Sequence, residues 1–113
     1  GAVRIALPLD GPLVSESPAA CRRMLLVDVD PAASGVATEP RDDFPPDPAQ
    51  WPDWLVAQGV HVLLARNLPA AVQEACAARG VQAAAGVPAG SPDAALDAYL
   101  SGAARAAHGA DGH

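Results

Sequence analysis

Lysine is absent from the 113-residue sequence, aromatic residues make up only 4%, and cysteine occurs twice. All seven basic residues are arginines, against thirteen acidic residues, and the formal net charge is −6 at pH 7. An acidic chain with few aromatics lacks the basic surface and the stacking groups of general nucleic-acid binding proteins, and an anionic membrane would repel it. We therefore expect neither a nucleic-acid nor a membrane partner.

Long apolar runs are also missing. No stretch approaches the roughly 20 apolar residues of a membrane-spanning helix, and the chain opens on a predicted strand rather than on a basic-then-apolar signal segment. Cys21 and Cys76 form neither a paired metal motif nor a disulfide framework. These absences predict a cytoplasmic protein with reduced thiols.

The most regular pattern lies in residues 59–81. It begins with a short apolar run, which is typical of a strand buried on both faces. We expect Asn67 to cap the helix that follows, with Pro69 in the first turn. Gly80 ends this helix and Val81 opens another strand. The pattern predicts a β-α-β unit with two parallel strands.

The remaining elements follow from alternating apolar residues and from turn residues between them. We expect strands at residues 3–9, 22–29 and 36–38, a short edge segment at 13–15, a short helix at 53–58, a strand at 81–85 and a last helix at 91–102. Residues 39–52 are rich in proline and acids, which predicts an irregular surface loop.

This order of elements predicts an α/β fold in one domain, residues 1–102. Its sheet is mixed and five-stranded, an antiparallel meander followed by parallel strands, and helices flank it. Gly102 is expected to end the last helix, which leaves residues 103–113 as a flexible C-terminal tail.

Arg66 and Asn67 lie at the carboxyl end of the central predicted strand. Open α/β sheets bind ligands at this end of their strands, and the N-terminus of the next helix offers free N–H groups to an anion. An anionic cluster or a carboxylated metabolite would suit such a place. The alternative interpretation is an ordinary capped turn.

Cys21 lies just before the second predicted strand and is followed by Arg22 and Arg23. A thiolate is a good ligand for iron in clusters, and we expect the two arginines to lower the pKa of this thiol. The alternative is a small buried hydrophobic side chain, which the lack of a second nearby cysteine favours. Cys76 lies on the apolar stripe of its helix and is predicted to pack in the core.

Short motifs recur along the chain in a fixed order. They are RIALP at residues 4–8, VS at 14–15, DVD at 28–30, GV at 59–60 and 80–81, and ALDAYLSG at 95–102. In order and spacing the sequence resembles the dinitrogenase iron–molybdenum cofactor biosynthesis family, the NifX-like domain, over nearly its whole length. The resemblance implies a ribonuclease-H-like three-layer α/β fold and a non-catalytic carrier of an iron–sulfur or iron–molybdenum cluster. It also implies nitrogenase-assembly or other metallocluster proteins as partners.

Two segments depart from the family pattern. The family's His-Phe-Gly falls on residues 17–19, so that Ser17 stands where the resemblance implies a metal-ligating histidine. The family's glycine-rich turn falls on residues 66–69, which contain no glycine. The predicted binding residues are Ser17, Cys21, Arg22, Arg66 and Asn67, with Cys21 as the metal ligand.

Two other functions stay open. The chain could be an interaction module without a cluster, acting through Trp51, Trp54 and the proline-rich segment around them. A hydrolase on a ribonuclease-H-like scaffold would use Asp10 with Asp28 and Asp30, because two-metal chemistry needs several convergent acids. The sequence contains no nucleophile elbow, no His–acid pair and no CxxC motif, so we predict that it is not an enzyme.

Overall fold

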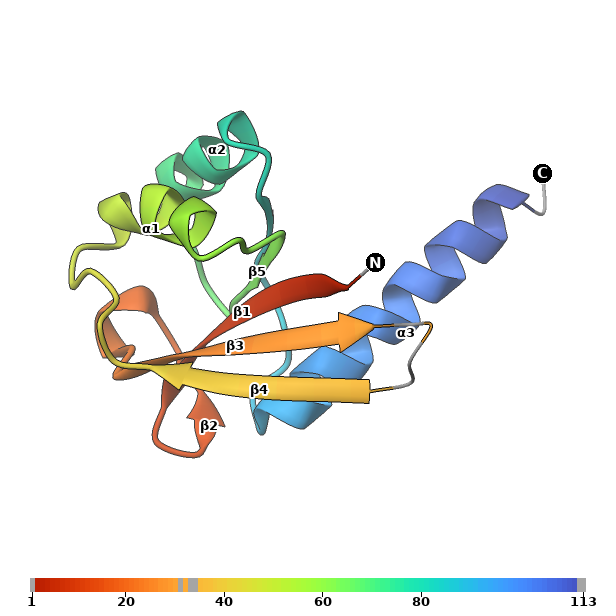
Figure 1. Cartoon of the computed structure of the whole chain (residues 1–113), viewed down its shortest axis with the longest axis horizontal. Helices are drawn as coiled ribbons and strands as arrows, with labels where there is room; N and C mark the ends of the chain where they lie inside the picture. Colours follow the sequence, from red (N-terminus) through yellow and green to blue (C-terminus); the bar gives the residue numbers. More distant parts are fainter. Residues whose placement is uncertain (1, 31, 33–34, 112–113) are drawn as a thin grey trace.

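The computed structural model describes residues 2–30, 32 and 35–111, with side chains described as far as Gly102. Within these residues the chain forms six strands, three α-helices and two short 3-10 turns (Figure 1). In chain order they are β1 (Val3–Asp10), β2 (Leu13–Val14), η1 (Pro18–Ala20), β3 (Arg23–Asp30), β4 (Gly35–Arg41), η2 (Pro48–Gln50), α1 (Trp51–Ala57), β5 (Val62–Leu64), α2 (Ala70–Ala78), β6 (Gln82–Ala84) and α3 (Pro92–Asp111). No helix in the described part is long and apolar enough to cross a membrane.

The strands form one mixed sheet with the order β4-β3-β1-β5-β6, and β2 pairs with β1 beside this path. β1 runs antiparallel to β3 and parallel to β5, and β5 runs parallel to β6. The predicted α/β architecture, with an antiparallel meander followed by parallel strands, is confirmed. The predicted number of five strands was wrong, because the short segment at Leu13 joins the sheet as a sixth.

β1 changes its neighbour part-way along its length. Its first half pairs with β5, where Ala6 faces Leu63, and its end pairs with β2, where Leu9 faces Val14. Pro8 lies between the two pairings, and its carbonyl accepts a hydrogen bond from the Ser15 N–H at 2.9 Å. A proline is tolerated in a strand only where the ladder requires no donor. Pro8 therefore marks the point where β2 and β5 separate.

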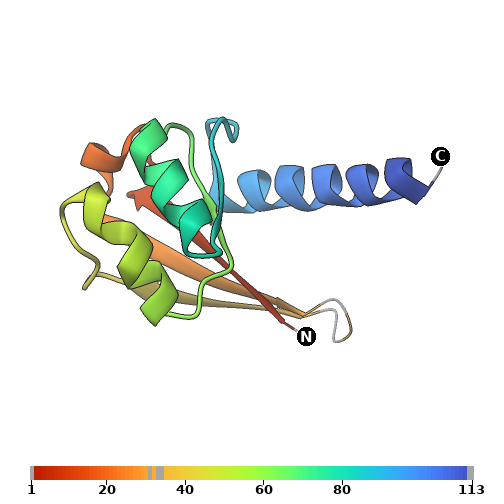
Figure 2. The same cartoon turned by 90° about the horizontal axis from the view of Figure 1, so that it is seen from above.

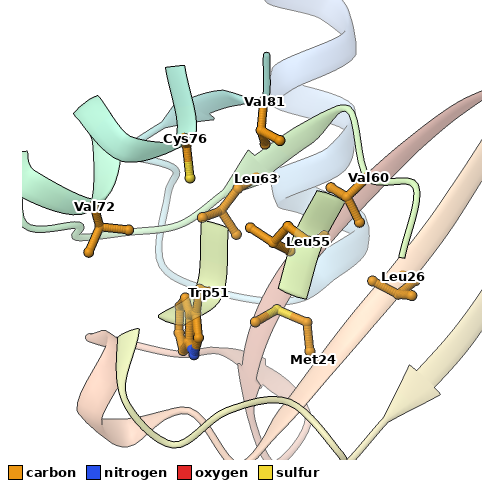
Figure 3. Close-up of a cluster of buried hydrophobic side chains, with 10 residues drawn as sticks. Met24, Leu26, Trp51, Leu55, Val60, Leu63, Val72, Cys76 and Val81 are labelled. Carbon is orange, nitrogen blue, oxygen red and sulfur yellow. The ribbon is translucent and has the colours of Figure 1, made fainter. Parts of the chain in front are cut away.

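Apolar side chains cover both faces of the sheet and form two clusters. On one face, α1 and α2 pack Trp51, Leu55, Val72 and Cys76 against the strands (Figure 3). On the other face, α3 packs through Ala95 and Leu96 (Figures 1 and 2). The molecule therefore has three layers. The prediction that Cys76 belongs to the core is confirmed, because this residue is fully buried.

Two predicted boundaries were wrong. β4 extends through Pro40 to Arg41, where the sequence predicts a loop, because an edge strand can place a proline on its unpaired side. α3 continues past Gly102 to Asp111, because alanine-rich sequence favours helix and an interior glycine costs only about 1 kcal/mol. The last two residues of the predicted tail, 112–113, lie outside the described residues.

Candidate functional site

Two loops meet at the end of the sheet where β1 and β5 finish and β3 begins. They are residues 15–22, between β2 and β3, and residues 65–69, between β5 and α2. The side-chain amide of Asn67 donates a hydrogen bond of 2.6 Å to the Glu16 carbonyl, although 51 positions separate these residues in sequence. This bond places the predicted binding residues Asn67 and Ser17 beside one another.

The first loop is held by Ser15, a buried polar side chain that is only 2% exposed. Its hydroxyl donates to the Ser17 carbonyl, which also accepts from the Ala20 N–H at 3.1 Å. The Ser17 hydroxyl makes no capping bond to the 3-10 turn that follows. Ser15 is not among the predicted binding residues. It belongs to the short VS motif at residues 14–15, and this motif was the sequence signal that could have identified it.

Cys21 lies half-buried at the end of this loop, against the core cluster beneath α1 and α2. Its thiol donates to the Arg23 carbonyl at 3.3 Å. Burial raises the pKa of the Cys21 thiol from 9.0 to about 11, and backbone hydrogen bonds from the neighbourhood offset only part of this rise.

The expectation that Arg22 and Arg23 lower the pKa of Cys21 was wrong. Arg22 faces Asp10, with Nε 3.4 Å from the carboxylate oxygen, and Arg23 binds Asp42 at 2.7 Å. Both guanidinium groups are therefore neutralised by carboxylates on the outside of the loop. At neutral pH Cys21 is a thiol, and a metal must displace its proton to bind.

Nothing else in the described part completes a metal site around Cys21. No group of three or more His, Cys, Asp or Glu residues with described side chains lies close enough together to hold a metal ion. Four-cysteine ligation, the usual attachment of an iron–sulfur cluster, is therefore not available from these residues. A cluster at this edge would depend on hydrogen bonds and charge, with Cys21 as a single sulfur ligand.

Arg22 lines a hollow whose lining residues do not include Arg66. The hollow has a volume of about 240 Å³ and is lined by Gly11, Arg22, Arg23 and Asp42. Arg22 keeps 81% of its side chain exposed, so its pairing with Asp10 leaves most of the guanidinium in solvent. The predicted binding residues therefore lie in two places. Arg22 lies near β1 and β3, whereas Asn67 lies near Ser17.

Arg66 differs from the other arginines. Five arginines with described side chains form ion pairs, namely Arg4, Arg22, Arg23, Arg41 and Arg79, whereas Arg66 forms none with any described residue. Its carbonyl accepts from the Gly86 N–H at 2.9 Å, which fixes the backbone at the end of β5. The guanidinium therefore adds an uncompensated positive charge to this edge of the sheet.

The predicted capping role of Asn67 was wrong. α2 begins at Ala70, Pro69 occupies the N-cap position, and no side chain caps the helix. The first backbone bonds into this turn come from the N–H groups of Val72 and Gln73 to the Pro69 carbonyl. The N–H groups at the start of α2 therefore have no side-chain cap.

The carboxylates of the hydrolase alternative do not converge. Asp28 faces Arg4 across the ladder and binds its guanidinium at 2.9 Å. Asp10 lies at the other end of β1, six residues from Arg4, which corresponds to roughly 20 Å along a strand. A two-metal site needs carboxylates around ions about 4 Å apart, so Asp10 and Asp28 do not form one.

The two tryptophans of the interaction alternative pack largely inside the fold. Trp51 is fully buried in the cluster of Figure 3, and its Nε1–H donates to the Pro45 carbonyl at 2.8 Å. Trp54 is half-buried under Phe44, at a ring-centroid distance of 6.5 Å, and under Arg41, whose guanidinium carbon lies 5.8 Å from the ring. Trp51 therefore stabilises the fold and is not available to a partner.

This architecture defines a small α/β domain whose two crossing loops form a candidate binding edge. A family model described as dinitrogenase iron-molybdenum cofactor matches residues 1–102. The chain therefore belongs to the dinitrogenase iron–molybdenum cofactor family, as the sequence motifs predict.

Three solved structures share this fold. The crystal structure of PH0822 has 21% identity and a TM-score of 0.75, and the match covers 88% of this chain and 92% of that chain. The apo form of the orange protein from Desulfovibrio gigas has 23% identity, a TM-score of 0.68 and 88% coverage of both chains. A protein from Thermotoga, proposed to be a NifB protein, has 24% identity and a TM-score of 0.62, with 88% of this chain and 89% of that chain covered. No curated protein sequence matches the chain.

Proposed function

We propose that this chain is a non-catalytic carrier domain that binds an iron–sulfur or iron–molybdenum cluster, or a related anionic ligand, as cargo. The binding place is the edge of the sheet where residues 15–22 meet residues 66–69. Membership of the dinitrogenase iron–molybdenum cofactor family supports the class of cargo. The local geometry supports the place.

The observation that carries this proposal is the free guanidinium of Arg66. Every other arginine with a described side chain is bound to a carboxylate, so an anion that arrives at this edge does not need to break an ion pair to reach Arg66. The guanidinium presents five N–H donors in a planar fork, which suits an anionic ligand with several acceptor atoms. The uncapped start of α2 adds backbone N–H groups and the positive end of a helix dipole.

Cargo that is assembled elsewhere fits these residues better than a cluster built on protein thiolates. The described side chains supply one accessible sulfur, from Cys21, and this sulfur is protonated at neutral pH. A preformed anionic cluster brings its own sulfides and its charge, so the protein needs mainly to supply donors. In this account Cys21 is the one residue that would bind the metal directly, and Asn67 positions the turn against residues 15–22.

The partners that we propose are proteins that deliver or receive such clusters, including nitrogenase-assembly proteins, in the cytoplasm. We also propose that the three-layer sheet belongs among the ribonuclease-H-like folds, although this chain uses the scaffold for binding and not for hydrolysis. The separation of Asp10 from Asp28 supports that view, because each carboxylate already faces an arginine.

Anaerobic reconstitution tests the proposal. The purified protein is incubated with preformed, thiolate-capped iron–sulfur or iron–molybdenum–sulfur clusters, passed through a desalting column and measured by visible absorption. We expect a cluster band that elutes with the protein. The absence of any protein-bound band would overturn the proposal of a metallocluster cargo.

Cys21→Ala and Cys76→Ala are matched variants for the metal-ligand role. If Cys21 binds the metal, its loss shifts or weakens the band, whereas loss of the buried Cys76 leaves the wavelength of the band unchanged. A band that is identical in wild type and in Cys21→Ala would remove Cys21 from the ligand set. The anion-binding role of Arg66 would then remain as a separate question.

A further inference from the structure

Ser15 is a polar side chain that the fold buries. Among the residues whose side chains the structure describes, it is the only polar one that lies buried, with 2% of its surface exposed. Burial of a hydroxyl costs free energy unless the hydroxyl forms a hydrogen bond, and an alanine would fill nearly the same space without that cost. The hydroxyl is therefore useful for the bond that it forms, in which it donates to the Ser17 carbonyl.

The backbone of Ser15 is itself held firmly. Its N–H donates to the Pro8 carbonyl on β1 at 2.9 Å. The N–H of the preceding residue, Val14, donates to the Gly90 carbonyl just before α3, also at 2.9 Å. A side chain can set the position of a neighbour only when its own backbone is fixed. Ser15 meets this condition and gives the loop that follows a rigid start.

The loop of residues 15–22 is closed at both ends on β1. The Ser15 N–H binds the Pro8 carbonyl, and the Arg22 N–H binds the Leu9 carbonyl at 2.8 Å. Since Pro8 and Leu9 are adjacent, the two ends of the loop leave the strand from almost the same place. The shape of the middle of the loop therefore depends on hydrogen bonds within it and on the bond from residues 65–69.

Few hydrogen bonds hold the middle of this loop. η1 contributes one from the Ala20 N–H to the Ser17 carbonyl at 3.1 Å and one from the Cys21 N–H to the Pro18 carbonyl at 3.2 Å. Both distances are at the long end of the range for N–H···O bonds, as is common in 3-10 turns. The Ser15 hydroxyl binds the first of these carbonyls, so it strengthens the turn at the residue where the turn begins.

Cys21 is the residue that this turn positions. It follows η1 directly, and its side chain lies half-buried against the core cluster beneath α1 and α2. Its thiol donates to the Arg23 carbonyl at 3.3 Å, and a thiol is a weak donor. Such a bond does little to fix the sulfur, so the position of Cys21 depends mainly on the backbone of the turn before it.

We propose that Ser15 is a positioning residue of the binding edge, in two steps. In the first step its hydroxyl fixes the Ser17 carbonyl, and the turn that begins there fixes Cys21. In the second step the cargo meets the Cys21 thiol at the place that this turn sets. The second step rests on the proposed function, whereas the first belongs to the free protein as well.

Alkylation of Cys21 in the free protein tests the first step. The rate of iodoacetamide labelling is measured by mass spectrometry at one pH, in a Cys76→Ala background. Ser15→Ala should raise this rate about 5- to 10-fold, because a turn that has lost one hydrogen bond opens more often and exposes the half-buried thiol. Ser15→Thr keeps the hydroxyl and should label far more slowly than Ser15→Ala. Ser91→Ala is the matched control, because it loses a side-chain bond to the Ala94 N–H at the start of α3, outside this loop.

Binding of preformed, thiolate-capped iron–sulfur or iron–molybdenum–sulfur clusters tests the second step. Affinity and the wavelength of the visible band are measured anaerobically. Ser15→Ala should weaken binding roughly 10-fold, which corresponds to the loss of one hydrogen bond, and should shift the band toward that of Cys21→Ala. Ser91→Ala should bind like wild type. General destabilisation does not move the band, so its shift distinguishes a change at Cys21 from a less stable fold.

The two steps fail on different results. Equal labelling of Cys21 with and without Ser15→Ala, or an equal increase in Ser91→Ala, would overturn the first step whether or not a cluster binds. Faster labelling of Ser15→Ala with an unchanged affinity and band would overturn the second. A wild type that binds no cluster would overturn the proposed function and with it the second step, whereas the first step would still stand or fall on the labelling. Circular dichroism checks that each variant is folded.

Discussion

At the scale of single residues, the chemistry of the site depends on which arginines already have carboxylate partners. In sequence, Arg22 and Arg23 stand next to Cys21, and this adjacency predicts a thiol with a lowered pKa. In the structure both side chains turn to Asp10 and Asp42. The sequence could not reveal these partners, because the Asp42 carboxylate is 19 positions from Arg23 and reaches it only through the β3–β4 pairing.

Cys21 should react slowly with alkylating reagents at neutral pH. Its thiol has a pKa of about 11, so the thiolate fraction at pH 7 is far smaller than for an ordinary cysteine. We expect the rate of iodoacetamide labelling, measured by mass spectrometry in a Cys76→Ala background, to rise with pH until it levels off near pH 11. A rate that levels off below pH 8 would mean that the two arginines do lower the pKa.

The same pKa shift makes folding stability depend on pH. The folded state holds the proton of Cys21 more tightly than the unfolded state, whose thiol has a pKa near 9.0. This contribution is fully present below pH 9, and it is lost as pH rises through the folded-state value of about 11. Urea unfolding of wild type and Cys21→Ala should therefore show a steeper loss of stability for the wild type between pH 9 and pH 11.

Trp51 should be the most costly aromatic residue to remove. It is fully buried, and its ring NH is bonded to Pro45, so Trp51→Ala should lower the free energy of unfolding by about 3–5 kcal/mol. Trp54→Ala, at a half-buried position, should cost clearly less. Urea denaturation of both variants measures the difference, and equal losses would contradict the assignment of Trp51 to the core.

At the scale of elements, residues 59–81 show what local pattern can predict. The apolar run, the helix and the next strand appear as β5, α2 and β6. The helix starts two residues later than Asn67 would set it as the N-cap, because Pro69 takes the N-cap position and the Asn67 amide binds Glu16 instead. A capping residue and a cross-loop donor have the same sequence signature, and only the tertiary neighbour distinguishes them.

Two other elements show where proline and glycine give a wrong prediction of the end of a strand or a helix. Pro40 predicts the end of a strand, yet β4 continues through it because the proline lies on a sheet edge. Gly102 predicts the end of a helix, yet α3 continues through it. Gly80 does end its helix, with φ at +78°, which is the conformation that favours glycine.

Gly102→Ala and Gly80→Ala should therefore change stability in opposite directions. Neither position has a heavy atom within 4 Å of an added Cβ, so backbone conformation alone decides the effect. Gly102→Ala should stabilise the protein by about 0.5–1 kcal/mol, because alanine loses less entropy in a helix, and Gly80→Ala should destabilise it by about 1 kcal/mol. Thermal unfolding measures both, and a destabilised Gly102→Ala protein would contradict the continuous helix.

At the scale of the whole molecule, the layered sheet follows from the sequence pattern, whereas the composition of the site does not. The order of strands and helices predicts the mixed sheet and the edge at which β5 ends. It does not predict that Arg22 lines a hollow beside β3, or that Asn67 joins two loops 51 positions apart. Such long-range contacts depend on how the layers pack, and local pattern carries no information on them.

The central claim is that the free guanidinium of Arg66 binds an anionic cluster at this edge. Its most direct test is the dissociation constant of synthetic thiolate-capped iron–sulfur and iron–molybdenum–sulfur clusters, measured anaerobically by visible absorption for wild type, Arg66→Gln and Arg79→Gln. Arg79 is the matched control, because its guanidinium pairs with Asp53 on α1, away from residues 15–22. We predict that Arg66→Gln weakens binding of at least one cluster by about 10- to 100-fold, as expected for the loss of a charge-assisted contact, while Arg79→Gln binds like wild type. Equal affinities of wild type and Arg66→Gln, or no binding by wild type, would contradict the claim.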